Sequence, residues 1–264
     1  MKINLIGPTY TQKTLDFNCQ DRINWYLVQN EMTGRGKYML YPTPGLTLVT
    51  TFSGSAFRSG GAWATDDYVY AVLDATVYKI DYNADSESAT TTNLGNLNTS
   101  TGAVQMSSNN SQVIISDGTD AFTYTVATGV LAEVTDVNFT GSSALVYLDG
   151  YFFIAVPNSL TLKHSAQQDG TSWPSANTAS ADSLHDNVIG LAANNRQLYV
   201  FGSKSTEVWF NNTNPSGFVL SRRDDTYIDR GCCNAKTIQT LNNLVIWMDD
   251  NRYIVSMTTD KPET

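Results

Sequence analysis

Paired carboxylates are the residues of this chain whose type and spacing best suit chemistry. Three adjacent pairs occur, Asp66/Asp67, Asp224/Asp225 and Asp249/Asp250. A glycosidase needs two acids at a fixed separation, because one protonates the leaving group while the other acts as base or nucleophile. Adjacent acids on one loop repel each other and usually face water, and two of the pairs coincide with expected turns. We therefore expect these pairs to be structural, and glycoside hydrolysis is the alternative.

Histidine and cysteine offer little further chemistry. Neither His164 nor His185 belongs to an HExxH motif or lies beside paired cysteines, so hydrogen-bonded surface histidines are expected in place of a zinc site. The cysteines are Cys19 and the adjacent Cys232 and Cys233. Adjacent side chains of a strand point to opposite faces, so the two cysteines cannot bind one metal together. We expect them to lie in the core. No GxSxG elbow supports a serine nucleophile. We predict no catalytic residue, no metal and no cofactor.

Two other motifs are expected to be turns. The glycine-rich SGGAWA at residues 59–64 lacks the spacing of phosphate-binding loops and precedes no helical pattern. The run from Ser165 to Trp173 resembles the Asp-box of sialidase-type propellers (S-x-D-x-G-x-T-W), with the spacing off by a residue. Even in a true Asp-box the aspartate caps backbone and the tryptophan packs inside, so the motif is a folding turn.

The composition of the chain limits the classes of protein to which it can belong. The 264 residues fit one large or two ordinary domains, and 41% hydrophobic residues suffice for a core. A net charge of −9 repels phosphate backbones and anionic lipid, so we expect no sequence-specific nucleic-acid binding.

Three cysteines cannot form a disulfide framework, which favours a reducing compartment. The start MKINLIG lacks the apolar region of a signal peptide, and no apolar run of about 18 residues occurs. We expect a soluble protein without membrane insertion.

The elements that must hold these residues follow a repeated hairpin pattern. In each repeat a polar pair precedes an apolar strand, which is followed by a second turn and another strand. The polar pairs are Asp66-Asp67, Asn109-Asn110, Asp149-Gly150, Asn194-Asn195 and Asn242-Asn243. The repeats recur roughly every 39 to 47 residues, close to the spacing of propeller blades. Asn and Asp suit these turns because both tolerate left-handed backbone angles.

We predict an all-β protein, a β-propeller with about five visible blade repeats. Three strands are visible in each unit, and a fourth in some, as in VLAEV and GFVLSRR. Residues 86–102 are rich in Ser, Thr and Asn and are expected to be a surface loop between blades. Residues 1–37 are assigned to an N-terminal docking extension and residues 38–264 to the propeller. Either residues 38–51 close the ring or the chain is part of a longer protein with six or more blades, and we favour the latter.

A string of motifs in residues 164–231 resembles the phage stabilisation family, the packaged-DNA stabilisation or tail-accessory proteins of short-tailed bacteriophages. The matching positions are Ser165, Asp169-Gly170, Trp173, Ala179 to Asp182, Asp186, Gly190, Phe201-Gly202, Ser205 to Trp209, Arg222 and Tyr227 to Cys232. Asn24 to Tyr26 and Tyr41 to Leu46 also match the opening of the family. Its members usually run well past 264 residues, which supports a longer chain.

The resemblance implies a structural protein of the virion and no enzyme. It implies a tail hub that docks below the portal and adaptor rings, seals packaged DNA and carries the needle, fibres or tailspikes. Such proteins form a ring, typically a hexamer, and are assembled in the bacterial cytoplasm. The alternative is a carbohydrate-binding or carbohydrate-hydrolysing propeller of the sialidase or lectin type.

Two groups of residues are candidates for the interfaces. Trp25, Tyr26 and Tyr41 precede the repeats and can anchor a partner, or their rings pack beneath the propeller. Arg222, Arg223 and Tyr227 form the second group. Because Asp224 follows directly, these arginines make either ion pairs between subunits or a self-satisfied strand end.

Overall fold

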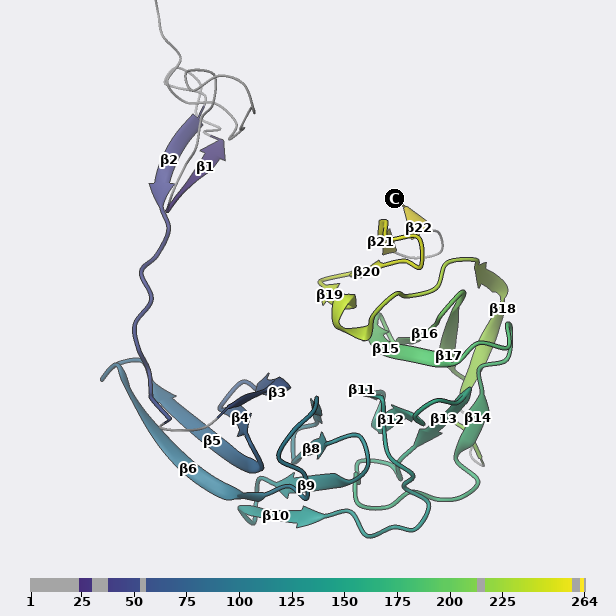
Figure 1. Cartoon of the computed structure of the whole chain (residues 1–264), viewed down its shortest axis with the longest axis horizontal. Helices are drawn as coiled ribbons and strands as arrows, with labels where there is room; N and C mark the ends of the chain where they lie inside the picture. Colours follow the sequence, from purple (N-terminus) through teal and green to yellow (C-terminus); the bar gives the residue numbers. More distant parts are fainter. Residues whose placement is uncertain (1–23, 30–37, 53–55, 213–216, 258–261, 264) are drawn as a thin grey trace, which may run out of the picture. The chain divides into compact units, whose positions relative to one another are not determined.

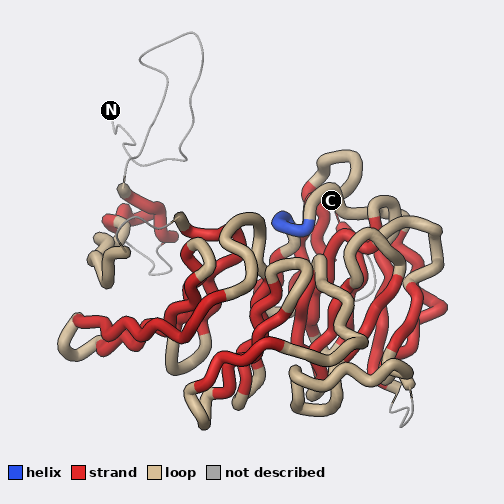
Figure 2. Tube along the Cα trace, turned by 60° about the horizontal axis from the view of Figure 1, so that its bottom comes forward, coloured by secondary structure: helices blue, strands red, loops and turns tan. Residues whose placement is uncertain are grey.

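The computed structural model describes residues 24–29, 38–52, 56–212, 217–257 and 262–263. Strands make up the regular structure of these residues apart from one 3-10 turn, Ala235–Thr237 (Figure 2). The all-β prediction is thereby confirmed. Among the described residues, no helix is long and apolar enough to cross a membrane.

The chain divides into two units between Val49 and Thr50. In the first unit β1 (Trp25–Gln29) and β2 (Tyr38–Pro42) pair antiparallel as a sheet of their own. Residues 38–42 therefore pair with the N-terminal segment. The domain limits drawn from the sequence at residue 37 remain a prediction.

The second unit contains, in its described residues, five four-stranded antiparallel sheets that follow one another along the chain (Figure 1). Sheet 1 comprises β3 (Phe57–Ala64), β4 (Val69–Leu73), β5 (Thr76–Asn83) and β6 (Ser88–Asn96). Sheet 2 comprises β7 (Gln105–Ser108), β8 (Gln112–Ser116), β9 (Ala121–Thr125) and β10 (Val130–Glu133). Sheet 3 comprises β11 (Ala144–Leu148), β12 (Tyr151–Ala155), β13 (Thr161–His164) and β14 (Thr178–Ser180). Sheet 4 comprises β15 (Val188–Asn194), β16 (Gln197–Gly202), β17 (Thr206–Asn211) and β18 (Leu220–Ile228). Sheet 5 comprises β19 (Gln239–Leu241), β20 (Leu244–Met248), β21 (Ile254–Met257) and β22 (Pro262–Glu263).

The polar pairs lie between the first and second strands of the sheets, as predicted. Asp149, Asn195 and Asn242 have φ angles of 49°, 49° and 53°. Side chains other than Gly, Asn and Asp seldom adopt this left-handed region. The turn chemistry therefore sets where these three hairpins reverse.

A fourth strand completes each sheet, and this corrects the loop expected at residues 86–102. Ser88–Asn96 forms β6, which pairs antiparallel with β5. The β-branched Thr90, Thr91 and Thr92 suit a strand. As the last strand of its sheet, β6 pairs on one side only, so its polar side chains can face water.

The glycine-rich stretch at residues 59–64 is also not a turn, contrary to expectation. It lies within β3, where the register against β4 shifts between Phe57 and Ala62. Gly60 has a φ of 78°. An irregularity of this kind bends a strand without ending it, and glycine supplies the unusual backbone angle.

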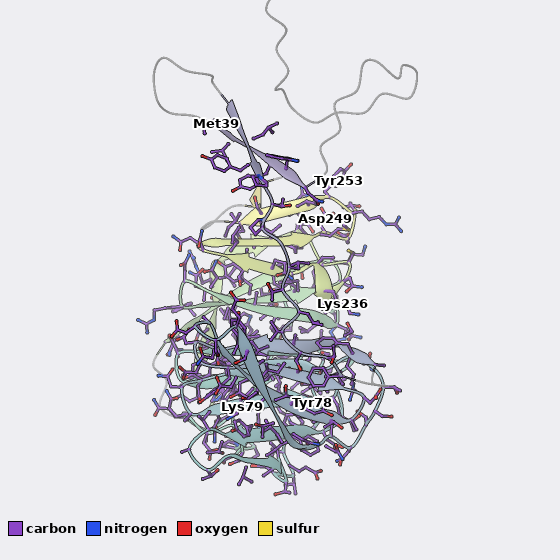
Figure 3. The ribbon with its side chains drawn as sticks, turned by 90° about the vertical axis from the view of Figure 1, so that its left-hand side faces the viewer. Met39, Tyr78, Lys79, Lys236, Asp249 and Tyr253 are labelled. Carbon is purple, nitrogen blue, oxygen red and sulfur yellow. The ribbon has the colours of Figure 1, made fainter. Side chains whose placement is uncertain are left out.

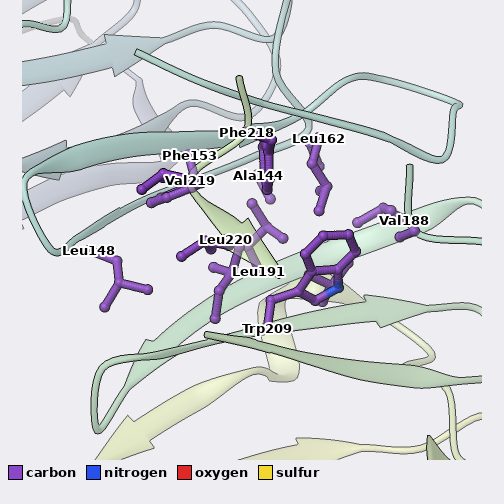
Figure 4. Packing of buried hydrophobic residues seen from close by; sticks show 14 residues of the cluster. Ala144, Leu148, Phe153, Leu162, Val188, Leu191, Trp209, Phe218, Val219 and Leu220 are labelled. Carbon is purple, nitrogen blue, oxygen red and sulfur yellow. The ribbon is translucent and has the colours of Figure 1, made fainter. Parts of the chain in front are cut away.

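The core consists of separate apolar clusters between consecutive sheets. The first strands of neighbouring sheets contact one another in the order β3, β7, β11, β15 and β19. Between sheets 3 and 4, for example, Phe153 and Leu162 pack with Trp209 and Phe218 (Figure 4). Each sheet thus covers a face of the next, as blades of a propeller do. Closure of the ring remains a prediction.

Candidate interaction surfaces

The β1–β2 hairpin carries exposed aromatic side chains, and we call it the aromatic hairpin. Tyr26 lies opposite Tyr41, with ring centroids 6.0 Å apart and planes 26° from parallel. The next pair on that face is Val28 and Met39, and Met39 is labelled in Figure 3. Trp25, on the opposite face, is 50% exposed.

Its exposure makes this hairpin a candidate for docking. A two-stranded hairpin is marginally stable in water on its own. Large apolar groups gathered on a surface commonly mark an interaction site. Trp25, Tyr26 and Tyr41 are each at least 42% exposed, and their role as partner contacts remains a prediction.

The second candidate group centres on Arg222 of β18. Its Nη1 lies 3.0 Å from Oδ1 of Asp182 and 3.8 Å from Oε1 of Glu207. Its Nε lies 3.5 Å from Oδ1 of Asp224. The guanidinium is therefore largely satisfied within its own chain, which favours the self-satisfied alternative for Arg222.

The neighbours of Arg222 form a shallow surface hollow. Arg223, Phe210 and Gln197 line it together with Arg222 and Asp224. Phe210 is 39% exposed, and the sequence analysis did not single it out. Its place in an aromatic run, VWF, concealed that it points outward. Tyr227 pairs with Glu207 through the backbone, and its side chain lies outside the described residues.

The motif residues of β17 are buried and bonded to each other. Glu207 and Trp209 are 4% and 6% exposed. Oε2 of Glu207 accepts a 2.8 Å hydrogen bond from Nε1 of Trp209, and Oε1 accepts one of 2.8 Å from the Ser183 amide. This carboxylate joins β17 to the loop that contains Ser183, so its role is structural.

A second motif carboxylate, Asp186, holds the turn after β16. Its Oδ2 accepts a 2.6 Å hydrogen bond from the Lys204 amide, and its Oδ1 accepts one of 3.2 Å from the Ser205 hydroxyl. A Cβ at Gly202 would collide with this carboxylate, and one at Gly231 would collide with the backbone of Ser203. Because both residues lack a side chain, the Asp186 carboxylate can lie against Gly202 and the backbone of Ser203 can lie against Gly231.

The pair Asp249/Asp250 is used to hold turns. Asp249 is fully buried; Nη1 of Arg230 donates to its Oδ2 at 2.6 Å, and the Tyr253 amide donates to its Oδ1 at 2.7 Å. Asp250 pairs with Lys204 at 3.0 Å, and this hydrogen bond lowers the pKa of Asp250. A two-acid catalytic site at this pair is therefore not supported.

The other two pairs differ from a glycosidase site as well. Asp66 and Asp67 are exposed on the turn between β3 and β4. The side chain of Asp224 is 89% exposed. The side chain of Asp225 lies outside the described residues.

His164 is buried, which corrects the expected surface position. It is 3% exposed and packs against the rings of Tyr151, Phe153 and Phe218. The Val219 amide donates to its Nε2 at 3.2 Å, and its Nδ1 lies 2.7 Å from the carbonyl oxygen of Ser165. Burial lowers the pKa of His164. His185, in contrast, is exposed as expected.

The run from Ser165 to Trp173 is a folding turn, as predicted. Oδ1 of Asp169 accepts hydrogen bonds from the Thr171 amide at 2.9 Å and the Thr171 hydroxyl at 2.7 Å. Trp173 is 1% exposed, and its Nε1 donates to the Gly170 carbonyl at 2.9 Å. The aspartate caps backbone and the tryptophan is core.

The cysteines differ in part from the expectation. Cys232 is buried, whereas Cys233 is exposed, so only one of the pair belongs to the core. Cys19 lies outside the described residues. Within the part of the chain that the structure describes, no three His, Cys, Asp or Glu side chains gather as metal ligands.

These features define an all-β protein whose motif residues hold turns and sheet interfaces. The chain belongs to the family described as "Bacteriophage P22 Gp10, beta-propeller", whose model matches residues 1–253. It is therefore a phage structural protein of the virion, and the predicted family and β-propeller class are confirmed.

Other comparisons support the fold alone. No curated protein matches. The computationally designed Ika8 protein matches with a TM-score of 0.54 at 14% identity, over 93% of this chain and 72% of that chain. The extracellular domain of a putative hybrid two-component system from B. thetaiotaomicron matches with a TM-score of 0.51 at 12% identity, over 78% of this chain and 27% of that chain.

Proposed function

We propose that this protein is a tail hub that docks below the portal and adaptor proteins and retains packaged DNA. It provides attachment for needle, fibre or tailspike proteins. Family membership supports a stabilising virion role. The observation that carries the docking role is the aromatic hairpin, a separate unit with exposed Trp25, Tyr26 and Tyr41.

The charge distribution suits a plug beside exiting DNA. The net charge is −9. Several basic side chains are engaged by their own chain, namely Arg58, Lys204, Arg222 and Arg230. A net negative charge repels phosphate backbones, so the duplex slides past when the channel opens.

Subunits of the hub form a ring, with six as the expected number, through head-to-tail contacts that close by rotation. The shallow hollow on sheet 4 offers one side of such a contact. Exposed Phe210 beside two arginines has the composition of an interface hot spot. No bond-making chemistry is required, and we expect no turnover of glycans.

The test uses a phage that lacks this gene, complemented in its host by the full-length protein. Without the protein, filled heads are expected to lose their DNA. The triple variant Trp25→Ala, Tyr26→Ala, Tyr41→Ala is expected to retain the thermal midpoint of the wild type but to be absent from purified virions. A matched control, Val130→Ala with Val137→Ala, removes exposed apolar groups of sheet 2 and its following loop and should be incorporated normally. Normal incorporation of the triple variant would refute docking through the hairpin.

A further inference from the structure

We propose that the second unit binds a neutral oligosaccharide, without cleaving it, in two adjoining hollows near the first strands of its sheets. The first hollow, about 630 Å³, lies by the β3–β4 and β7–β8 turns. The second, about 330 Å³, lies between residues of β3, β7, β11, β15 and β19. Ser108 and Tyr147 line both, so together they form one site. Volumes of roughly 300–1,000 Å³ are typical of ligand sites.

Two aromatic side chains of this site are held in fixed positions. Nε1 of Trp63 donates to Oγ of Ser108 at 2.8 Å. The hydroxyl of Tyr147 donates to Oε1 of Gln168 at 2.9 Å, and its ring packs 4.9 Å from that of Phe152. Both rings are half-buried. Aromatic faces fixed in this way stack on the C–H faces of sugar rings without first losing rotational freedom.

The polar groups of the site suit hydroxyl ligands. Asp66, Asp67 and Asn110 are exposed at the first hollow, and Gln239 and Thr240 line the second. Carboxylates accept hydrogen bonds from hydroxyl groups, and amides both donate and accept. A polyhydroxylated ligand can satisfy them together.

The charge of the site excludes anionic ligands. None of the described residues that line either hollow is Lys, Arg or His. Lys79 is not among the lining residues, and its Nζ lies over the Tyr68 ring at 4.4 Å. Asp66 and Asp67 repel phosphate and carboxylate groups. A basic peptide would find charge partners only at these two residues, because the second hollow is lined by neutral groups, so a neutral glycan fits better.

The same residues argue for binding without hydrolysis. Glycosidases place two carboxyl groups on opposite sides of the bond, about 5–9.5 Å apart. Here Asp66 and Asp67 are neighbours on one turn, and no other carboxylate is among the described lining residues. The site can hold a sugar but lacks an opposed acid.

Saturation-transfer NMR and tryptophan fluorescence on the full chain test this proposal with neutral trisaccharides of glucose, galactose and mannose. At least one trisaccharide is expected to bind and to emerge uncleaved. Asp66→Asn with Asp67→Asn, and separately Trp63→Leu, should each weaken binding at least tenfold. A matched control on β5, Asp81→Asn with Tyr82→Leu, lies outside both hollows and should leave affinity unchanged.

Three outcomes would overturn the proposal: no trisaccharide binds, binding survives all these substitutions, or oligolysine binds in their place. Circular dichroism of each variant identifies loss of fold, and the Asp-to-Asn variant retains side-chain size if Trp63→Leu unfolds. The proposal is independent of the hub role, because virion incorporation and trisaccharide binding are measured separately.

Discussion

Oε2 of Glu207 lies 2.8 Å from Nε1 of Trp209, two residues along the same strand and on the same buried face of sheet 4. Alternation along a strand brings residues i and i+2 to one side. A buried carboxylate is costly unless its lone pairs are satisfied. The Thr-Glu-Val-Trp motif therefore forms an internal hydrogen-bonding unit of sheet 4.

Trp209→Phe is expected to lower the free energy of unfolding by about 1–3 kcal/mol, because it leaves a buried carboxylate oxygen without its donor. Urea denaturation measures the change. Trp63→Phe is the matched control, since its indole bonds only to a half-buried hydroxyl, and it should cost less. Equal losses in the two variants would contradict the role of Glu207.

Asp249→Ala is expected to destabilise the protein by about 3–5 kcal/mol, because Arg230 and two turn amides lose their acceptor. The neighbouring Asp250 supplies the control. Its ion pair with largely exposed Lys204 lies at the surface, so Asp250→Asn should cost no more than about 1 kcal/mol. Thermal denaturation of both variants compares them, and a larger loss for Asp250→Asn would reverse our assignment.

Stability should decline as pH falls below about 6.5, the ordinary pKa of histidine. Burial lowers the pKa of His164 in the folded state, so the unfolded chain binds a proton first. The free energy of unfolding then falls by up to about 1.4 kcal/mol per pH unit until the folded pKa is reached.

His164→Gln should abolish that slope between pH 6.5 and 5, as measured by urea denaturation at each pH. The carboxyl groups of Asp117, Asp136, Asp169 and Asp250 have lowered pKa values. Their contribution is lost only below about pH 4, so it does not overlap this window. An unchanged slope in the variant would assign the effect to other groups.

Gly202→Ala is expected to cost about 1–3 kcal/mol, because the added methyl group displaces the Asp186 carboxylate that holds the amides of Lys204 and Ser205. Gly45→Ala is the control, since nothing lies within 4 Å of its Cβ position. Differential scanning calorimetry of both variants tests this. A neutral Gly202→Ala would show that the turn relaxes without loss.

Local patterns account for what could be predicted. Apolar strands bounded by Asn and Asp turns indicated the hairpins of the five sheets, and the Asp-box-like run was correctly assigned as a turn. The prediction of a loop at residues 86–102 was wrong because a polar strand at the edge of a sheet has the same composition as a loop. The predicted surface position of His164 was wrong because its burial depends on Phe218 and Val219, more than fifty residues away in the sequence.

By itself the sequence determined the all-β class and the spacing of the hairpins, because alternation and turn chemistry act between near neighbours. The ordered motifs of residues 164–231 pointed to the phage family. Tertiary structure alone decided which polar groups became buried partners. Asp249 with Arg230 and Glu207 with the Ser183 amide meet only when strands and loops pack. Burial and pairing are properties of contacts between segments distant in the chain, and no local pattern encodes them.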